Sequence, residues 1–194
     1  MNPQITRKIM NLFARIDNQI SNLIWHTGLR CPDYCGRCCY NKRVDISPLE
    51  LYPLVSFFIH TGALEIWLEK LYNPDTGVTC IFHQSDPLNP DKGRCLVYSF
   101  RPCVCRLFGF SGRIADTGEH IMLPCKVQSK EYPEAVQMAR HFVQGQKKIP
   151  LLTGYKQRLM HLDPELGNKY MPMNQAIKFV LEKAAIIQKY STVE

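Results

Sequence analysis

Four cysteines fall within nine residues of this chain, in the stretch CPDYCGRCC. The nine cysteines of the sequence are Cys31, Cys35, Cys38, Cys39, Cys80, Cys95, Cys103, Cys105 and Cys125. Clustered thiols can form disulfides, bind metal ions, carry out redox chemistry or pack as small apolar side chains. The function that the sequence predicts depends mainly on which of these four uses applies.

A disulfide framework does not fit these cysteines. Their number is odd, so at least one thiol would stay unpaired, and a bridge between the neighbours Cys38 and Cys39 would close a strained ring. The N-terminal apolar residues are interrupted by Arg15, Asp17 and Asn18, so no signal-peptide core is visible and we expect a cytoplasmic protein with reduced thiols. Buried free cysteine explains one or two such positions, but four beside charged residues favour metal ligation.

Composition and charge give little support for a membrane or nucleic-acid partner. Hydrophobic residues make up 45% of the chain and charged residues 21%, and no apolar run approaches the roughly 18–20 residues that span a bilayer. The net charge of +7 counts thiols as neutral. A metal centre with four thiolates carries about −2, so two such sites would lower the charge to about +3. The basic residues are scattered and not interleaved with aromatic ones, so we expect no nucleic acid.

The spacing of the cysteines suggests how they would bind metal. A Cys-x2-Cys pair lets two thiolates converge on one ion from a turn. Cys38 and Cys39, by contrast, project in different directions from adjacent backbone units. Adjacent cysteines therefore suit ligation of two metals, or of two atoms within one cluster. Ligands from separated segments would also cross-link the fold.

These motifs resemble the YkgJ-like cysteine-cluster family, a zinc- or iron-chelating domain named for a CxxCxxCC pattern. The family's later motifs match Cys80, then Cys95-Leu96-Val97-Tyr98, then Arg101-Pro102-Cys103-Val104-Cys105-Arg106, and the resemblance spans about residues 31–125. One departure is that the first pair here is Cys31-x3-Cys35, one residue longer than the family pattern. The resemblance implies eight metal ligands, enough for two four-thiolate sites: Cys31, Cys35, Cys38, Cys39, Cys80, Cys95, Cys105 and Cys125.

The identity of the metal stays open between an iron–sulfur cluster and zinc, since all-thiolate ligation fits both. We favour the cluster, because vicinal cysteines near arginine donors suit a polynuclear centre. Arg101 and Arg106 bracket Cys105, and we expect their guanidinium groups to donate hydrogen bonds to thiolate sulfur, with a pair of surface arginines as the alternative. Cys103, at a variable position of the motif, and His83, at a zinc-finger-like spacing, are not counted as ligands.

Three functions compete on these residues. The first is a metal-binding protein with a structural or electron-transferring site, whose C-terminal helices meet a protein partner. The second is a cluster-dependent protein-modifying enzyme, because flagellin lysine methylases are similar in carrying a related cysteine cluster. In it, a surplus thiol such as Cys103 would be redox-active if arginine neighbours lowered its pKa. The third is a zinc-ribbon nucleic-acid binder.

The elements that must position these thiols indicate an α+β, mostly helical fold: a small cysteine-ligated module with short β-hairpins, packed with N- and C-terminal helices. Apolar residues at three- and four-residue steps predict an amphipathic helix over residues 5–24. Ser47-Pro48-Leu49-Glu50 reads as a capping box that starts a helix broken at Thr61-Gly62. The remaining expectations, by residue range, are a short helix over 63–72 that ends near Asn73-Pro74, hairpins over 77–99 and 112–125, and helices over 133–144, 151–162 and 174–189.

We expect residues 1–125 to form the metal-binding module and 126–194 a helical region packed on it, as one compact unit.

Overall fold

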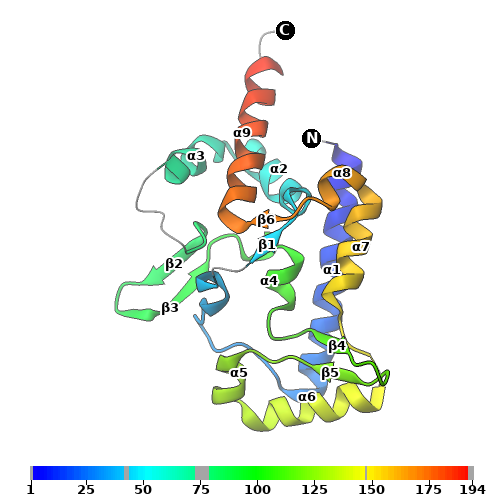
Figure 1. Ribbon diagram of the computed structural model, residues 1–194. Helices are drawn as coiled ribbons and strands as arrows, with labels where there is room; N and C mark the ends of the chain where they lie inside the picture. Colours follow the sequence, from blue (N-terminus) through cyan, green and yellow to red (C-terminus); the bar gives the residue numbers. More distant parts are fainter. Residues whose placement is uncertain (1, 42–43, 73–78, 147, 192–194) are drawn as a thin grey trace.

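The computed structural model describes residues 2–41, 44–72, 79–146 and 148–191 (Figure 1). As predicted, the fold is α+β and mostly helical. The α-helices are α1 (Pro3–Thr27), α2 (Tyr52–Thr61), α3 (Leu64–Tyr72), α4 (Cys103–Leu107), α5 (Lys126–Glu131), α6 (Pro133–Gln146), α7 (Leu152–Leu162), α8 (Pro164–Gly167) and α9 (Met173–Ser191). The 3-10 helices are η1 (Arg37–Tyr40), η2 (Pro48–Leu51) and η4 (Tyr98–Phe100). Antiparallel pairs join β1 (Asp45–Ile46) to β6 (Met171–Pro172), β2 (His83–Asp86) to β3 (Asn89–Cys95) and β4 (Gly112–Ile114) to β5 (His120–Met122).

The long N-terminal helix is the predicted amphipathic one. The side chain of Asn2 caps its start, and its buried face includes Ile9, Phe13 and Ile16. It ends at Gly28, which adopts the left-handed φ of 68° that an L side chain rarely adopts. Figure 1 shows α1 lying beside α7 and α8. The helix thus forms one wall of the fold and delivers the chain to the cysteine-rich loop.

The predicted capping box is present, although the helix that it starts opens with one 3-10 turn. Ser47 Oγ accepts a hydrogen bond from Leu49 N–H at 3.1 Å, and Glu50 Oε1 accepts one from Ser47 N–H at 3.2 Å. The chain continues into α2, which ends at the predicted break, Gly62. The short helix α3 follows as predicted, and its expected end near Asn73-Pro74 lies outside the described residues.

The first hairpin was predicted in the right region with the wrong strands. We expected strands in GVTCIF and RCLVYS, on either side of the turn DPLNPDKG. Instead, β2 begins just after GVTCIF, β3 lies largely within the polar stretch, and Leu88 N–H donates to Asp86 Oδ1 at 2.9 Å in a tighter turn. The apolar residues that suggested strands pack into the core instead, with Phe82 3% and Val97 8% exposed. The second hairpin, β4–β5, is confirmed.

The C-terminal helices α6, α7 and α9 lie where the sequence predicted them. The short helices α5 and α8 and the pair β1–β6 were not predicted. The pair β1–β6 ties the segment just after the cysteine loop to the start of α9, with Ile46 opposite Met171. Helix α9 also contacts α2 and α3, and α1 contacts α6 and α7. The two ends of the chain therefore contribute to one hydrophobic core. The division into residues 1–125 and 126–194 stays a prediction.

Among the described residues, no single helix is long and apolar enough to cross a membrane. The stretches Pro48–Thr61 and Leu64–Tyr72, bent by 115°, have sufficient length and apolar composition only when they are taken together. Their side chains Leu51, Leu54 and Phe58 belong to the core.

Candidate metal centre

The cysteine-rich loop turns sharply twice and packs against the β2–β3 hairpin. Tyr34 and Gly36 have φ values of 55° and 56°. A Cβ at Gly36 would lie 2.7 Å from His83 Nε2, so only glycine fits both the backbone conformation and the close approach. Gly93 N–H donates to the Tyr34 carbonyl at 2.8 Å. The loop is thereby fixed to the hairpin just before its two adjacent cysteines.

Cys38 and Cys39 lie on the 3-10 helix η1, which holds their side chains beside Cys80. Cys39 N–H bonds the Gly36 carbonyl at 2.9 Å and closes the first turn of η1. Cys80 N–H then bonds the Cys39 carbonyl at 3.1 Å. A direct backbone contact thus joins two cysteine segments that lie 41 residues apart in the sequence.

Asn174, on the first turn of α9, holds the backbone on both sides of Cys80. Its Oδ1 accepts a hydrogen bond from Ile81 N–H at 3.1 Å, and its Nδ2 donates to the Thr79 carbonyl at 2.9 Å. Sequence reasoning missed this residue, because the contact spans more than ninety positions and Asn174 belongs to no motif. It is the clearest contribution of the C-terminal region to the position of a thiol.

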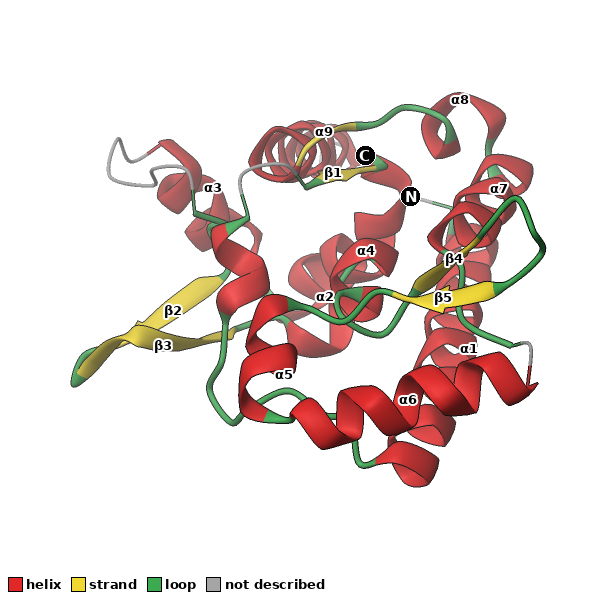
Figure 2. Cartoon of the chain, turned by 60° about the horizontal axis from the view of Figure 1, so that its bottom comes forward, coloured by secondary structure: helices red, strands yellow, loops and turns green. Residues whose placement is uncertain are grey.

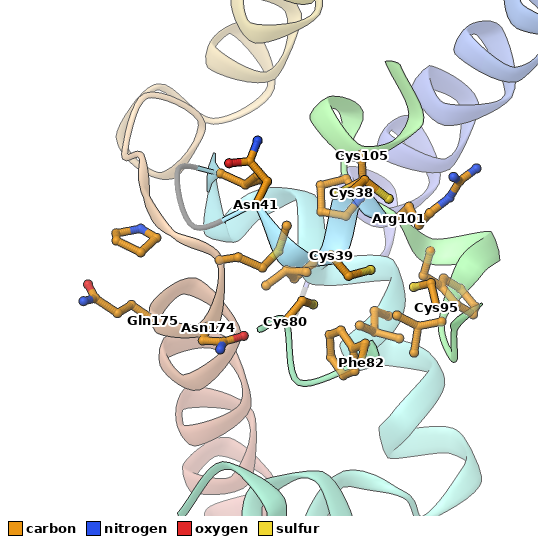
Figure 3. A pocket seen from close by; sticks show the side chains of 18 residues that line it. Cys38, Cys39, Asn41, Cys80, Phe82, Cys95, Arg101, Cys105, Asn174 and Gln175 are labelled. Atoms are coloured by element: carbon orange, nitrogen blue, oxygen red, sulfur yellow. The ribbon is translucent and has the colours of Figure 1, made fainter. Parts of the chain in front are cut away.

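Two further segments carry Cys95 and Cys105 to the same place. Cys95 is the last residue of β3, opposite His83 in the ladder. Cys105 lies on α4, where its N–H bonds the Pro102 carbonyl at 3.0 Å. Figure 3 shows the side chains of Cys38, Cys39, Cys80, Cys95 and Cys105 around one cavity. We call these five the inner thiol group, and the cavity of about 220 Å³ that they line the inner cavity.

The other predicted ligands lie on an adjoining cavity of about 270 Å³, the outer cavity. Cys31, Cys35 and Cys125 line it, and we call them the outer thiol group. Members of the inner group other than Cys80 line it too, so the two cavities share a wall of thiols. Cys125 caps α5, with Gln128 N–H donating to its sulfur at 3.4 Å. The structure thus brings all eight predicted ligands to one region, and all nine cysteines of the chain are free thiols.

The inner thiols perturb one another strongly. Cys39 shares hydrogen bonds with the sulfurs of Cys38, Cys80 and Cys95, which raise the pKa of Cys39 far above its ordinary value. The same hydrogen bonds lower the pKa of Cys38 to about 6 and lower the pKa values of Cys80 and Cys95. One proton held on Cys39 therefore favours thiolate at its neighbours. Thiolate is the form that binds metal.

Burial acts in the opposite direction at two other thiols. It raises the pKa of Cys105, and the nearby Cys38 and Cys80 raise it further. It also raises the pKa of Cys31 to about 11, with added repulsion from Cys125 and Cys35. Cys31 is exposed as a residue, so this effect comes from the protein atoms packed around its sulfur. These two thiols need a positive charge beside them before they ionise at neutral pH.

Arg101 provides positive charge between the two groups. It lines both cavities, and its charge contributes to the lowered pKa values of Cys38 and Cys95 and partly offsets the rise at Cys31. Its Nε donates to the Tyr98 carbonyl at 3.0 Å, and its guanidinium lies 3.3 Å from the centre of the Tyr98 ring. Arg101 therefore lies where a residue that compensates thiolate charge was expected.

Arg106 lies elsewhere, in the packing between α4 and α1. Its Nε donates to the Arg101 carbonyl at 2.7 Å, its Nη1 binds Asp17 Oδ2 at 2.5 Å, and its Nη2 donates to the Ser99 carbonyl. The guanidinium also covers the ring of Phe13 at 4.3 Å. The structure does not bring Arg106 to the metal centre, because Arg106 is not among the residues that line either cavity. It anchors the helix that carries Cys105.

The idea that arginine neighbours activate Cys103 is corrected by the structure. Cys103 is 1% exposed, and burial together with Glu50 raises its pKa well above the ordinary value, which outweighs the opposite effect of Arg106. Cys103 N–H donates to Glu50 Oε2 at 2.6 Å. Because α4 turns by about 100° per residue, Cys103 faces the core while Cys105 faces the cavities. A buried, protonated thiol is a poor redox nucleophile.

His83 is half-buried, which agrees with the partly exposed side chain that we expected. Its ring contacts Tyr40 edge-on at 4.6 Å, and desolvation lowers its pKa. Its Nε2 is buried with no hydrogen-bond partner among the described residues. It is not among the residues that line either cavity. The surplus of thiols there leaves no position that requires an imidazole ligand.

The donor set fits a thiolate-bound metal, although its atoms are not already arranged around an ion. Within the described ranges, no three His, Cys, Asp or Glu side chains form a ready metal site. The five inner thiols nevertheless line one cavity with largely apolar walls, which include Leu54, Phe82 and Val97. Each cysteine has one side-chain torsion with three staggered positions, so rotation about χ1 can move its sulfur within the cavity without moving the backbone. Soft sulfur donors select zinc or iron–sulfur clusters over magnesium or calcium.

Comparison with known proteins gives one match. The family model CxxCxxCC, described as "Putative zinc- or iron-chelating domain", matches residues 30–135, which is more than half of the 194-residue chain. The match covers α4, η1, the hairpins β2–β3 and β4–β5, and all nine cysteines. Neither a search of curated proteins nor a search of solved structures gives a match.

Proposed function

The chain belongs to the CxxCxxCC family of zinc- or iron-chelating domains, and from that premise we propose that its inner thiol group holds an iron–sulfur cluster. The thiolates of Cys39, Cys80, Cys95 and Cys105, with Cys38, are the ligands that the inner cavity offers. When bound, such a cluster would supply a one-electron redox centre. Zinc, bound by four of the same thiolates, is the alternative.

The size of the inner cavity is the observation that supports a cluster. The number of thiols does not decide the question, because zinc and an iron–sulfur cluster each take four of the five that line it. The cavity volume of about 220 Å³, however, exceeds by far the 10–15 Å³ or so that a single water needs on a comparable measure. This room favours a polynuclear centre over a single ion.

The outer thiol group is the basis for a second site. Cys31, Cys35 and Cys125 line the outer cavity, and Cys38 is the inner thiol nearest to them in the chain. In this proposal Cys38 completes either the inner or the outer set of four. Its lowered pKa suits both uses, because it is ionised at neutral pH. Eight thiolates from separated segments would thus serve two centres.

The role that these contacts favour is structural, with electron transfer added if the centre contains iron. The inner thiols come from four separate segments of the chain, which are η1, the segment at Cys80, β3 and α4. Binding one centre would cross-link all four segments, so the free energy of binding would be free energy of folding. Arg101 would hold the charge of the bound centre in place through its remaining N–H donors.

Metal analysis of protein purified without oxygen tests this proposal. We expect iron and acid-labile sulfide in the purified chain, with a broad visible charge-transfer band. A colourless protein with stoichiometric zinc would replace the cluster with zinc and leave the ligands as proposed. A chain that folds and retains neither metal would overturn the proposal. The variant Cys103→Ala is the matched control, because this thiol lies outside both cavities and its loss leaves the metal content unchanged.

A further inference from the structure

Separate from the two thiol-lined cavities, the helices α1 and α7 enclose a groove lined by cationic side chains. Its volume is about 390 Å³. Lys8 and Arg15 line it from α1, and Arg158 and His161 from α7. The remaining lining residues are Asn11, Leu12 and Leu162. Figures 1 and 2 both show the two helices side by side, so the groove lies on a surface that belongs to both ends of the chain.

The side chains that line this groove are positively charged or neutral. Among the described residues, none that lines it is acidic. Of the acidic residues close by in sequence, Asp17 pairs with Arg106, whereas Asp163 and Glu165 lie at the start of α8 and do not line the groove. The charge of the lining therefore favours an anionic ligand.

Packing beneath the groove holds its two walls in place. Tyr155, on α7, donates from its Oη to Gln19 Oε1 on α1 at 2.5 Å. Leu12 and Leu159 are buried between the helices, at 5% and 0% exposure. The backbone positions of the cations are thus fixed before any ligand binds, which reduces the entropy lost on binding.

The spacing of the cations fits an extended chain of anions. Lys8 and Arg15 are seven residues apart on one helix, which at a rise of about 1.5 Å per residue separates them by about 10 Å. In an extended peptide, side chains on one face belong to residues two or four apart, at about 7 or 13 Å, and the long, flexible side chains of Lys8 and Arg15 can reach either spacing. On the opposite wall, His161 already bonds the Gln157 carbonyl through Nδ1 at 2.7 Å. Arg158 is therefore the residue of that wall whose guanidinium group donates to an anion.

We infer that this groove binds an extended acidic segment of a protein partner. Nucleic acid fits less well, because the part of the chain that the structure describes puts no aromatic side chain in the lining of the groove for a base to stack on. A single phosphate fits less well too, because the cations are spread over two helices. The inference is independent of the metal centre, and it gives the predicted C-terminal interaction surface a definite place on α7.

A fluorescent hexaglutamate peptide, titrated into the full-length, metal-loaded chain and followed by anisotropy, tests the inference. We expect saturable binding at about 20 mM salt that weakens strongly at about 200 mM, where screening is shorter-ranged. The triple variant Lys8→Gln, Arg15→Gln, Arg158→Gln should bind about tenfold more weakly, as expected for the loss of three exposed ion pairs. The matched control changes charge equally at exposed sites outside the groove, in the variant Arg113→Gln, Arg140→Gln, Lys183→Gln.

Three outcomes would overturn the inference. One is that hexaglutamate does not bind, and another is that the control triple weakens binding as much as the groove triple. The third is that a single-stranded RNA of equal charge binds more tightly and loses affinity through the groove substitutions, which would assign the groove to nucleic acid. Metal content is measured on every variant and should not change, so failure of the groove and failure of the metal centre remain distinguishable.

Discussion

Cys39 and Cys31 lie eight residues apart in the sequence, yet the fold holds them in different ways. Cys39 is on the 3-10 helix η1, and its carbonyl accepts a hydrogen bond from Cys80 N–H. Hydrogen bonds also connect its thiol to three other sulfurs. Cys31 is exposed, on a loop whose nearby residue Tyr34 has a left-handed backbone. The inner group is therefore built from several segments joined by long-range contacts, whereas the outer group depends mainly on one loop, which Gly93 holds at Tyr34, and on the cap of α5.

This difference indicates that the inner thiols are fixed more firmly by the rest of the fold than the outer thiols are. Contacts from the C-terminal helix α9 position Cys80, and the buried Arg106 anchors α4 beneath Cys105. Among the outer thiols, Cys125 alone has a hydrogen bond to its sulfur from a described residue. We expect substitutions in the inner group to affect both metal content and stability, and those in the outer group to affect metal content alone.

The largest effect is expected for Cys39→Ala. This substitution removes the thiol that joins three others, so the inner centre should lose its metal and the chain should lose the stability that the metal provides. For free metal at 1,000 times its Kd, that stability is about 4.1 kcal/mol. Metal per chain and thermal unfolding are measured together, with Cys103→Ala as the control. Full metal content in Cys39→Ala would show that Cys39 is not a ligand.

Substitution of Glu50 should have the next largest effect on stability, because Glu50 binds the start of α4, the helix that carries Cys105. Its carboxylate accepts the buried N–H groups of Ser47 and Cys103. In Glu50→Ala both donors lose their partner, which costs about 2–6 kcal/mol together, but the desolvation cost of the buried carboxyl group also disappears, so the free energy of unfolding should fall by about 2–4 kcal/mol. Chemical denaturation measures it, with the exposed Glu69→Ala as control. Equal stability of the two variants would contradict this reading of Glu50.

The same carboxyl group predicts a pH dependence. Burial raises the pKa of Glu50 above its ordinary value of 4.5, despite opposing hydrogen bonds, so the folded state binds its proton more tightly than the unfolded state does. The free energy of unfolding should therefore fall as pH rises from 4.5 towards the raised value. Glu50→Gln removes this slope, because it cannot titrate. A slope that persists in Glu50→Gln would assign the effect to another group.

Features with a local signal could be predicted from the sequence. The spacing of apolar residues predicts α1, and the Ser47-to-Glu50 box predicts the start of the next helix, because both depend on neighbours within a turn or two. The cysteine motifs likewise predict that the thiols gather. That these thiols bind metal stays a prediction.

Features set by distant contacts could not be predicted in this way. Glu50 caps its own helix as expected, but it also binds Cys103, 53 positions away. Asn174 lies in no motif, and Arg106 is turned to Asp17 by packing on α1. The first hairpin was misplaced because core packing removed Phe82 from the strand that its type suggested. In each case a tertiary contact decided what the local pattern left open.

A smaller effect is expected in the outer group. Cys31→Ala and Cys125→Ala should each lower the metal content only by the share that the outer site holds, and should leave the metal of the inner centre in place. Elemental analysis and the visible spectrum separate the two contributions. Because Cys31 is exposed, Cys31→Ala should change the stability of the metal-free protein by no more than about 0.5 kcal/mol. Complete loss of metal in either variant would mean that the two groups form a single centre.

The smallest effect concerns the loop itself and compares two neighbouring positions. Tyr34 has a φ of 55°, which costs an L residue about 1–2 kcal/mol, whereas Asp33 is not among the residues with positive φ. In the metal-free protein, Tyr34→Gly should therefore be more stable than Tyr34→Ala by about 1 kcal/mol. At Asp33 the order should reverse, because glycine gains more freedom in the unfolded chain. Chemical denaturation of the four variants measures both differences. If alanine is the more stable residue at position 34 as well, the loop does not hold the left-handed turn in solution, and the contrast between a fixed inner group and a strained outer loop loses its basis.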